Sequence, residues 1–562
     1  VLRVNDDGSH TTITHNVWKI LNEQGREKYS ELSVPARPEN ILDVRAISPT
    51  GEVFLPIGAR GSTFTLEGLQ AGWLVETRYL DDNGASDRGF ESGGWYFRDP
   101  NFGRDADPVV LSRWVVDLPA SMDPPLLIRN YGPPPAPIVE GDRRVWVFEK
   151  KDQDRVDDEP RMPSADEICP WARFYTAWSW EELNLQALGF LSRVHPSPIL
   201  EAKAREIAGG ASDPMAKARA LYDWVNKEVK GNAGGWGPTG VLLERSGDRF
   251  TLFAALLRSA GVAFDPVRVC TSDPDQVLWE ALEPDAFDTE GIIVRGPDPT
   301  TREDDAFVFR FARHTPFGRI PHGARGKPAF IPGAGGATLF KMPVTGDEEF
   351  VSRSRMEVSL GGGATDTTFR LRAEEPSDGW FGYKERIKDL NEDDRRKETA
   401  RLTERWIKTA DVKDYSYPTL DEYGAPFVLE SSGGAPKLLL TEGGETALPL
   451  GIDAMEMAGQ YVERPERTWP FVVGGEWGRH NEVVFDLGSK WRVKRLPRNH
   501  AASSTLGTYS LTVHHEGGRV RVVRSARFGE ARYSPDQYRE FTSWCRAIDE
   551  AEEQRIVIEE AK

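Results

Sequence analysis

The stretch SGDRFTLFAALLRSAG, residues 246–261, decides the fold of the middle of this chain. Its apolar residues recur at helical spacing, which predicts a helix that begins near Ser246 and ends at Gly261. Serine is a preferred helix N-cap, and glycine is preferred just past a helix C-terminus. The pattern therefore predicts a helix with one buried stripe, made of Phe250, Phe253, Leu257 and Ala260.

The sequence on either side divides into four segments of different pattern. Residues 1–155 show short alternating stretches separated by turns such as DDG, EQG, PTG and DNG, which is typical of a β-sandwich. Residues 156–195 form an acid- and Pro-rich linker that leads into the first helix of a core. Residues 196–345 carry helices and then short strands, and residues 346–562 return to a β pattern. At 562 residues the chain is too long for one core, so several domains are expected.

Helices interrupt the β pattern of the last segment. The polar stretch KERIKDLNEDDRRKETARLTERWIK, residues 384–408, predicts one long helix laid on a sheet with a solvated outer face. A final helix should start at Ser534 and Pro535, because serine caps helices and proline suits their first turn. The predicted class is multidomain α+β, with an N-terminal β-sandwich, a mixed core and a C-terminal β-rich domain containing one long helix.

Composition argues against several partners and cofactors. The formal net charge of −18 disfavours nucleic acid and anionic membranes, since both need clustered cations. Cys169, Cys270 and Cys545 form no CxxC pair, so we expect no metal and no other cofactor. No apolar run approaches the ~20 residues that span a bilayer, so no transmembrane segment is expected. The chain starts at Val1 with no visible signal peptide, which predicts a processed chain or a fragment.

The helix of residues 246–261 resembles the nucleophile helix of the transglutaminase-like superfamily. In that family a cysteine begins the helix, an aspartate follows two residues later, and an ALLRxxG-type run closes it. Asp248, the run Ala255–Arg258 and Gly261 stand at the matching positions here. The cysteine position is occupied by Ser246.

Other motifs extend the resemblance over nearly the whole chain. NVWKILNEQGREKYSELSV (16–34) and ILDVRAISPTGEVFLP (41–56) resemble a bacterial β domain of the DUF3857 type. TPFGRIPHGARGKPAFI (315–331) resembles the segment that closes a transglutaminase-like core. SPDQYREFTSWCRAID (534–549) resembles the last helix of a DUF3858-like domain. The order and spacing of these motifs support the resemblance more than any one of them.

The resemblance implies a papain-like core with Cys, His and Asp on a helix and two adjacent strands. A thiolate nucleophile needs a paired imidazolium, and a carboxylate must orient that imidazole, so all three groups are required together. Here the three positions hold Ser246, Thr289 and Phe309, and one residue either side of Phe309 gives Val308 or Arg310. These departures predict a catalytically degenerate, transglutaminase-like protein that acts as a binding or scaffold component.

Two active alternatives remain open. Ser246 is either a helix cap or the nucleophile of a hydrolase or acyltransferase, in which case His314 is the candidate base. Serine requires a base more strictly than cysteine does, because its hydroxyl is scarcely ionised at neutral pH. The second active alternative is a cysteine enzyme that uses Cys270 with a neighbouring histidine.

The cleft of the expected core should be lined by Trp236, Ser246 and Asp248, and a protein or peptide is the expected ligand. Asp248 and Arg249 are expected at the surface of the first helical turn. The resemblance, rather than the composition, implies a bacterial cell-envelope or periplasmic location.

Overall fold

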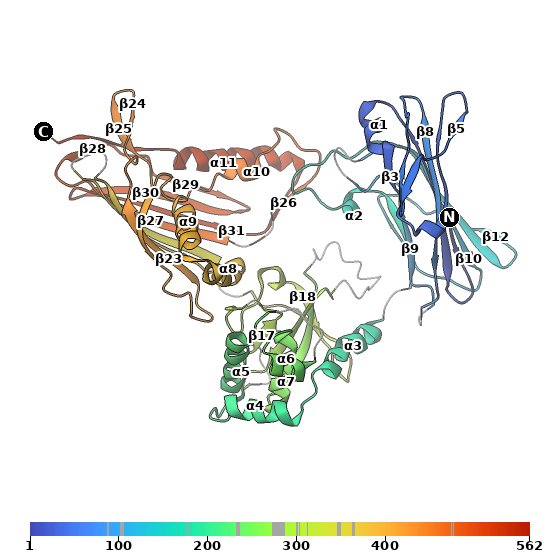
Figure 1. Cartoon of the computed structure of the whole chain (residues 1–562), viewed down its shortest axis with the longest axis horizontal. Helices are drawn as coiled ribbons and strands as arrows, with labels where there is room; N and C mark the ends of the chain where they lie inside the picture. Colours follow the sequence, from blue (N-terminus) through green and yellow to red (C-terminus); the bar gives the residue numbers. More distant parts are fainter. Residues whose placement is uncertain are drawn as a thin grey trace. The chain divides into compact units, whose positions relative to one another are not determined.

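The computed structural model describes the chain except for residues 87–88, 102–105, 177–178, 232–236, 272–286, 299–301, 303, 312, 345–349, 362–365, 474, 476 and 562. The described residues form two compact units (Figure 1). The first contains residues 1–158 and a segment that begins at Ser164. The second contains Glu159–Pro163 and most of the chain after residue 178. The expected multidomain α+β class is confirmed.

The N-terminal unit is built from face-packed β-sheets. An eight-stranded sheet has the order β12 (Ile138–Glu140), β13 (Arg143–Gln153), β10 (Val109–Pro119), β1 (Leu2–Val4), β2 (His10–Lys19), β8 (Leu74–Asn83), β4 (Ile41–Ile47) and β5 (Val53–Phe54). A second sheet has the order β11 (Leu126–Arg129), β14 (Trp171–Tyr175) and β9 (Ser92–Tyr96). Trp114 and Phe148 of the large sheet pack with Phe174 of the small one, so the core lies between the two sheets.

Smaller elements complete the N-terminal unit. These are a third sheet, β3 (Glu31–Ser33), β7 (Thr63–Thr65) and β6 (Gly58–Arg60), and two helices, α1 (Glu23–Ser30) and α2 (Ala165–Ile168). Asn22 caps α1 by accepting a hydrogen bond from the backbone of Gly25, as the preference for Asn at helix starts leads one to expect.

The structure divides the expected linker of residues 156–195 between the two units. Strand β14 pairs with β9 and β11, so this part of the segment completes the N-terminal core. Residues Glu159–Pro163 belong to the second unit, and so does α3 (Trp180–Leu188). The sequence pattern hid β14 because its strand partners begin about 45 and 80 residues earlier in the chain, and such long-range pairing leaves no local periodic signal.

The core of the second unit combines helices with an antiparallel sheet. Its helices are α4 (Pro198–Ala208), α5 (Pro214–Glu228), α6 (Pro238–Glu244) and α7 (Arg249–Ser259). The sheet has the order β17 (Ala306–Phe309), β16 (Thr289–Val294), β15 (Phe264–Val269), β18 (Pro328–Ile331) and β19 (Thr338–Lys341). Helices α4, α5, α6 and α7 share one hydrophobic cluster with residues of β16 and β17, so they cover one face of the sheet.

Helix α7 is buried on every side. All residues from Arg249 to Leu257 are buried, rather than the single stripe that the helical spacing predicts. A helix that is apolar all round belongs in the interior, because no face of it can meet water without cost. This helix is therefore the element around which the core is assembled. The helix ends at Ser259, and Gly261, just past the C-cap Ala260, has the left-handed φ of +69° that closes many helices.

The C-terminal part of the second unit is dominated by one wide sheet. Its strand order is β22 (Asp411–Ser416), β23 (Phe427–Gly434), β21 (Thr368–Glu375), β20 (Val351–Ser359), β27 (Trp477–Asp486), β31 (Arg519–Phe528), β30 (Gly507–Glu516) and β29 (His500–Ser504). Two small sheets accompany it, β24 (Leu440–Glu442), β25 (Glu445–Leu448), β33 (Ile556–Glu560) and β28 (Trp491–Arg495), and β26 (Phe471–Val473) with β32 (Ala531–Tyr533). Helices α10 (Met457–Tyr461) and α11 (Tyr538–Glu552) pack in the same core.

The long helix predicted over residues 384–408 is two helices. Helix α8 runs Asp378–Asp389 and α9 runs Glu392–Thr403. Asn391 breaks the segment, because it is extended and accepts the amide hydrogen of Asp394 as an N-cap. The expectation of one helix was wrong because helical spacing continues across a short break that only the capping residues signal.

Lys384 of α8 anchors the loop between β22 and β23. Its ammonium group donates hydrogen bonds to the carbonyl oxygens of Thr419 at 2.8 Å, Glu422 at 3.0 Å and Ala425 at 2.7 Å. The side chain is fully buried, and burial lowers its pKa to about 8. The carbonyl of Thr419 also accepts the amide hydrogen of Glu422 at 3.1 Å, so two of the three backbone acceptors depend on this one donor group.

We expect Lys384→Met to lower the free energy of unfolding by about 3 kcal/mol, because it leaves the carbonyl groups of Glu422 and Ala425 without a donor and removes a bond to that of Thr419. Lys388→Met on the same helix is the matched control, since Lys388 makes partly exposed ion pairs with Glu385 and Asp421. The control should cost about 1 kcal/mol or less. Urea denaturation measures both, and equal effects would contradict the anchoring role.

Candidate functional site

Ser246 lies in an exposed turn before α7 and does not cap the helix. It forms an isolated parallel β-bridge with Lys230, and Gly231 lies beside its hydroxyl group. Within the described part of the chain its Oγ atom makes no hydrogen bond. The sequence predicted the N-cap at Ser246, two residues before its true position at Asp248.

Asp248 is the N-cap of α7. Its Oδ1 accepts hydrogen bonds from the backbone of Phe250 at 3.0 Å and Thr251 at 3.2 Å. Its Oδ2 accepts from the Thr251 hydroxyl at 2.7 Å and from Nη1 of Arg310 at 2.9 Å. Burial alone would raise the pKa of this carboxyl, but the bonds from Thr251 and the charge of Arg310 hold it below its ordinary value. Asp248 is thus a structural cap and not the solvated residue that the sequence suggested.

The two strand positions expected to carry His and Asp face away from α7. Phe309 is buried in the cluster on the far side of the sheet, together with Val269. Thr289 is the register partner of Val269, and directly paired strand residues point to the same side. The residues next in sequence, Glu290 and Arg310, therefore point toward the start of α7.

A group of charged residues joins the start of α7 to these strands. We name it the Arg310 cluster; it consists of Arg310, Asp248, Glu290, Arg193 and Arg268. Besides Asp248, the Arg310 guanidinium contacts Glu290 at 3.4 Å. Glu290 also pairs with Arg193 at 2.8 Å and Arg268 at 3.2 Å, and its side chain is only 9% exposed. Each of the three expected catalytic positions, Ser246, Thr289 and Phe309, lies within two residues in sequence of a member of this cluster.

His314 is held in a different network. Its ring is fully buried and its Nε2 lies 2.7 Å from Oε1 of Glu385, on α8. The ring stacks on Tyr423, and its backbone amide donates to Asn226 at 2.8 Å. Burial lowers the pKa of His314, and this effect outweighs the opposite effect of Glu385. His314 and Ser246 make no hydrogen bond with each other in the described structure.

The remaining core candidates have structural surroundings. Arg249 is buried, not solvated as expected, and its Nε donates to the carbonyl of Val229 at 2.8 Å. Cys270 is fully buried in an apolar cluster with Phe330. Trp236, expected to line the cleft, lies outside the described residues.

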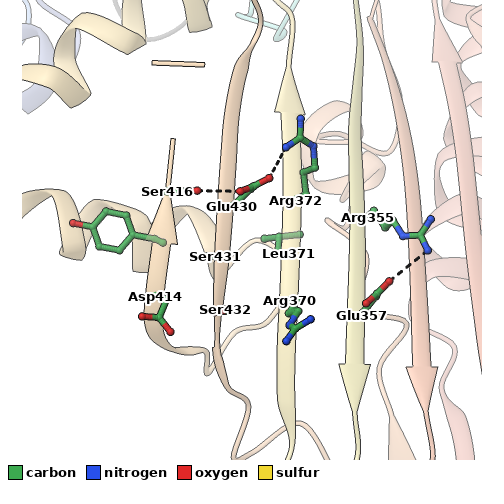
Figure 2. Close-up of a pocket in the computed structure, with 11 residues that line it drawn as sticks. Arg355, Glu357, Arg370, Leu371, Arg372, Asp414, Ser416, Glu430, Ser431 and Ser432 are labelled. Carbon is green, nitrogen blue, oxygen red and sulfur yellow. Dashed lines mark hydrogen bonds and ion pairs between the residues drawn. The ribbon is translucent and has the colours of Figure 1, made fainter. Parts of the chain in front are cut away.

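A depression of about 450 Å³ lies on the wide C-terminal sheet, at β20, β21, β23 and edge strand β22 (Figure 2). Ion pairs already occupy most of its charged side chains: Arg372 pairs with Glu430, which also accepts from Ser416 at 3.0 Å, and Arg355 pairs with Glu357 at 3.4 Å. Sequence reasoning did not find this site. Its only signal was polar residues alternating along several strands, a pattern shared by any half-exposed sheet.

Arg370 and Asp414 are the uncommitted charges of the depression. Among the described residues neither side chain forms an ion pair or hydrogen bond. Both stand in register with Ser432 between them, on β21, β23 and β22 in turn. At strand spacing, the backbones of this cation and this anion therefore lie about 10 Å apart, with Ser432 between them.

Comparison with known proteins identifies part of the chain. The family described as "Domain of Unknown Function with solved-structure structure (DUF3858)" matches residues 453–558, which confirms a DUF3858-like region within the last segment. The fold is similar to the crystal structure of "a putative protease from Parabacteroides distasonis ATCC 8503", with a TM-score of 0.58 and 11% identity over 100% of this chain and 97% of that chain. At this identity the likeness shows a shared fold alone. No curated protein matches the chain.

Membrane spanning by a helix finds no support in the described residues. None of their helices combines the length and the apolar character needed to cross a bilayer.

We expect Asp248→Ala to lower the free energy of unfolding by about 2 kcal/mol, because it removes both the cap and the partner of Arg310. Asp248→Asn keeps a capping side chain and should cost about 1 kcal/mol or less. The carboxyl has a depressed pKa in the folded state, so its contribution is present above the unfolded pKa of about 3.9 and is lost as the pH falls below it. Denaturation from pH 7 to pH 3 should therefore show the gap between wild type and Asp248→Asn closing; a constant gap would contradict this role.

Proposed function

We propose that this chain is a transglutaminase-like protein that has lost acyl transfer and serves as a binding or scaffold component, in a bacterial cell envelope. The observation that carries the proposal is the Arg310 cluster. Glu290 and Arg310, the strand residues that face the start of α7, are paired with each other and with Asp248. The N-terminal segment is proposed to be DUF3857-like and the core papain-like, and the envelope location rests on the resemblance alone.

The chemistry of the cluster supports the loss of catalysis. A general base must accept a proton near its nucleophile, which requires a free lone pair at an accessible position. Glu290 is the carboxylate nearest this role, and three guanidinium groups surround it. Its oxygens are already engaged in these ion pairs, so it is poorly placed to accept a proton from a nucleophile. The ion pairs of the Arg310 cluster instead hold the start of α7 against the strands of the sheet.

The serine-hydrolase alternative receives less support. His314 would have to reach Ser246, but it is buried and bonded to Glu385 of α8. Its pKa is lowered by burial, which suits a neutral imidazole, yet a base without access to the hydroxyl group cannot activate it. Cys270 is less suited still, because it is fully buried in an apolar cluster, whereas reactive cysteines are at least partly accessible.

The depression on the C-terminal sheet is the proposed ligand site, and a peptide is the proposed ligand. Arg370 offers a free guanidinium to an acidic side chain or a terminal carboxylate, and Asp414 offers a carboxylate to a basic group. Edge strand β22 also has no strand partner on its outer side in the described sheet. An extended peptide can pair with such an edge and present its side chains to the depression.

A serine-directed fluorophosphonate probe tests the loss of catalysis. We expect no labelling of the wild-type chain at neutral pH, because Ser246 has no bonded base. Ser246→Ala is the matched control and should give the same blank result, while an active serine hydrolase at equal concentration should label fully. Labelling of the wild type that disappears in Ser246→Ala would overturn the proposal.

Calorimetric titration with a tetraglutamate peptide tests the ligand site. Arg370→Ala should weaken binding about tenfold, because one charge-assisted hydrogen-bonding group is lost. Arg60→Ala removes the same charge from an exposed strand of the N-terminal unit and should leave the affinity unchanged. Equal affinities of the wild type and Arg370→Ala would contradict the assignment.

A further inference from the structure

A tight turn in the bridge between the N-terminal unit and the core is bound by the C-terminal region. The turn is Glu159–Met162, sequence EPRM, in which the carbonyl of Glu159 accepts the amide hydrogen of Met162 at 3.0 Å. Pro160 fixes φ at the second position, and Arg161 has a φ of +61° at the third. These are the features of a type II turn, where glycine or asparagine normally occupies the third position. An arginine in this conformation indicates that surrounding contacts hold the turn.

The carboxylate of Glu159 is the centre of those contacts. It is 3% exposed, and it accepts the backbone amides of Thr468 at 2.8 Å and Trp469 at 3.2 Å. The Arg467 side chain lies within 3.5 Å of the carboxylate and is itself 1% exposed. A buried carboxylate requires such donors, because an unpaired charge in the interior is very costly.

The other two residues of the turn are bound as specifically. The carbonyl of Pro160 accepts Nη2 of Arg467 at 2.7 Å, and the carbonyl of Arg161 accepts the amide of Val472 at 3.0 Å. The Arg161 guanidinium lies over the ring of Tyr461, with 4.6 Å to its centroid. The charge, the turn and the aromatic contact thus each select one residue of the Glu-Pro-Arg sequence.

The receptor side is preorganised. The guanidinium of Arg467 lies 5.0 Å from the ring centroid of Phe471 and 5.3 Å from that of Tyr538, so two aromatic rings fix its orientation. We name the group that binds the turn the turn-binding site; it consists of Tyr461, Arg467, Thr468, Trp469 and Val472. All five residues lie within the DUF3858-like stretch 453–558.

We propose that the turn-binding site is a recognition site for peptides of the form Glu-Pro-Arg in a type II turn, and that the bridge of this chain occupies it in cis. The site recognises four groups of the turn: the carboxylate of Glu159, the carbonyls of Pro160 and Arg161, and the guanidinium of Arg161. A free peptide of the same sequence competes with a tethered copy whose effective concentration is on the order of a millimolar. This proposal goes beyond the loss of acyl transfer and does not depend on it, since none of its residues belongs to the core.

The test uses the full chain and a fluorescent peptide of residues 157–164, DDEPRMPS. In the released variant, Glu159→Ala, Pro160→Gly and Arg161→Ala together remove the tethered copy. We expect saturable binding to the released variant, at least about tenfold tighter than to the wild type. A peptide carrying Glu159→Gln is the matched control and should bind about tenfold more weakly, since it lacks the charge that the site selects.

Two outcomes overturn the proposal: a folded released variant that binds no better than the wild type, or equal binding of the two peptides. Hydrogen exchange on the single variant Glu159→Ala provides a second test if the released variant does not fold. The amides of Thr468 and Trp469 should exchange at least about tenfold faster than in the wild type, while amides of β30 and β31 should be unchanged. Unaltered protection at 468 and 469 would also overturn the proposal.

Discussion

The guanidinium of Arg310 joins the start of the central helix to two strands of the core sheet. It contacts Asp248, which caps α7, and Glu290, which lies on β16. Helix α7 is buried on all sides, so the position of its first turn is set by hydrophobic packing in the core and by the ion pairs of the Arg310 cluster. An intact papain-like enzyme needs a base and a free nucleophile at the same place. Here that place holds compensated charges, and for this reason we propose binding by the β domains in place of catalysis.

The sequence predicted the elements of the core better than the directions of its side chains. Helix α7, its closing Gly261 and the multidomain α+β class followed from periodicity, turn signals and length. Thr289 and Phe309 were assigned by counting along motifs, and counting cannot tell which face of a strand a residue occupies. A shift of one residue moves a side chain to the opposite face of the sheet. The N-cap was assigned to Ser246 instead of Asp248 because serine and aspartate are about equally good N-caps and both precede the apolar run.

Long-range contacts explain the rest of what the sequence did not reveal. Strand β14 and the turn at Glu159 were both contained in a stretch that had the composition of a linker. Glu159 is bonded to residues more than 300 positions later, and no local pattern records such a partner. The depression around Arg370 is equally non-local, because it combines four strands from residues 355 to 432. Both proposed ligand sites therefore consist of residues that only the fold brings together.

The thiol pKa of the variant Ser246→Cys reports whether an imidazole partner has been retained at the start of α7. It is measured from the pH dependence of alkylation by iodoacetamide, with wild type as background because Cys169, Cys270 and Cys545 are all buried. With no imidazole bonded to this position, we expect an ordinary midpoint near pH 8.5. A midpoint well below pH 7 would reveal a retained imidazolium partner, as in active papain-like enzymes, and would rule out the proposed loss of catalysis.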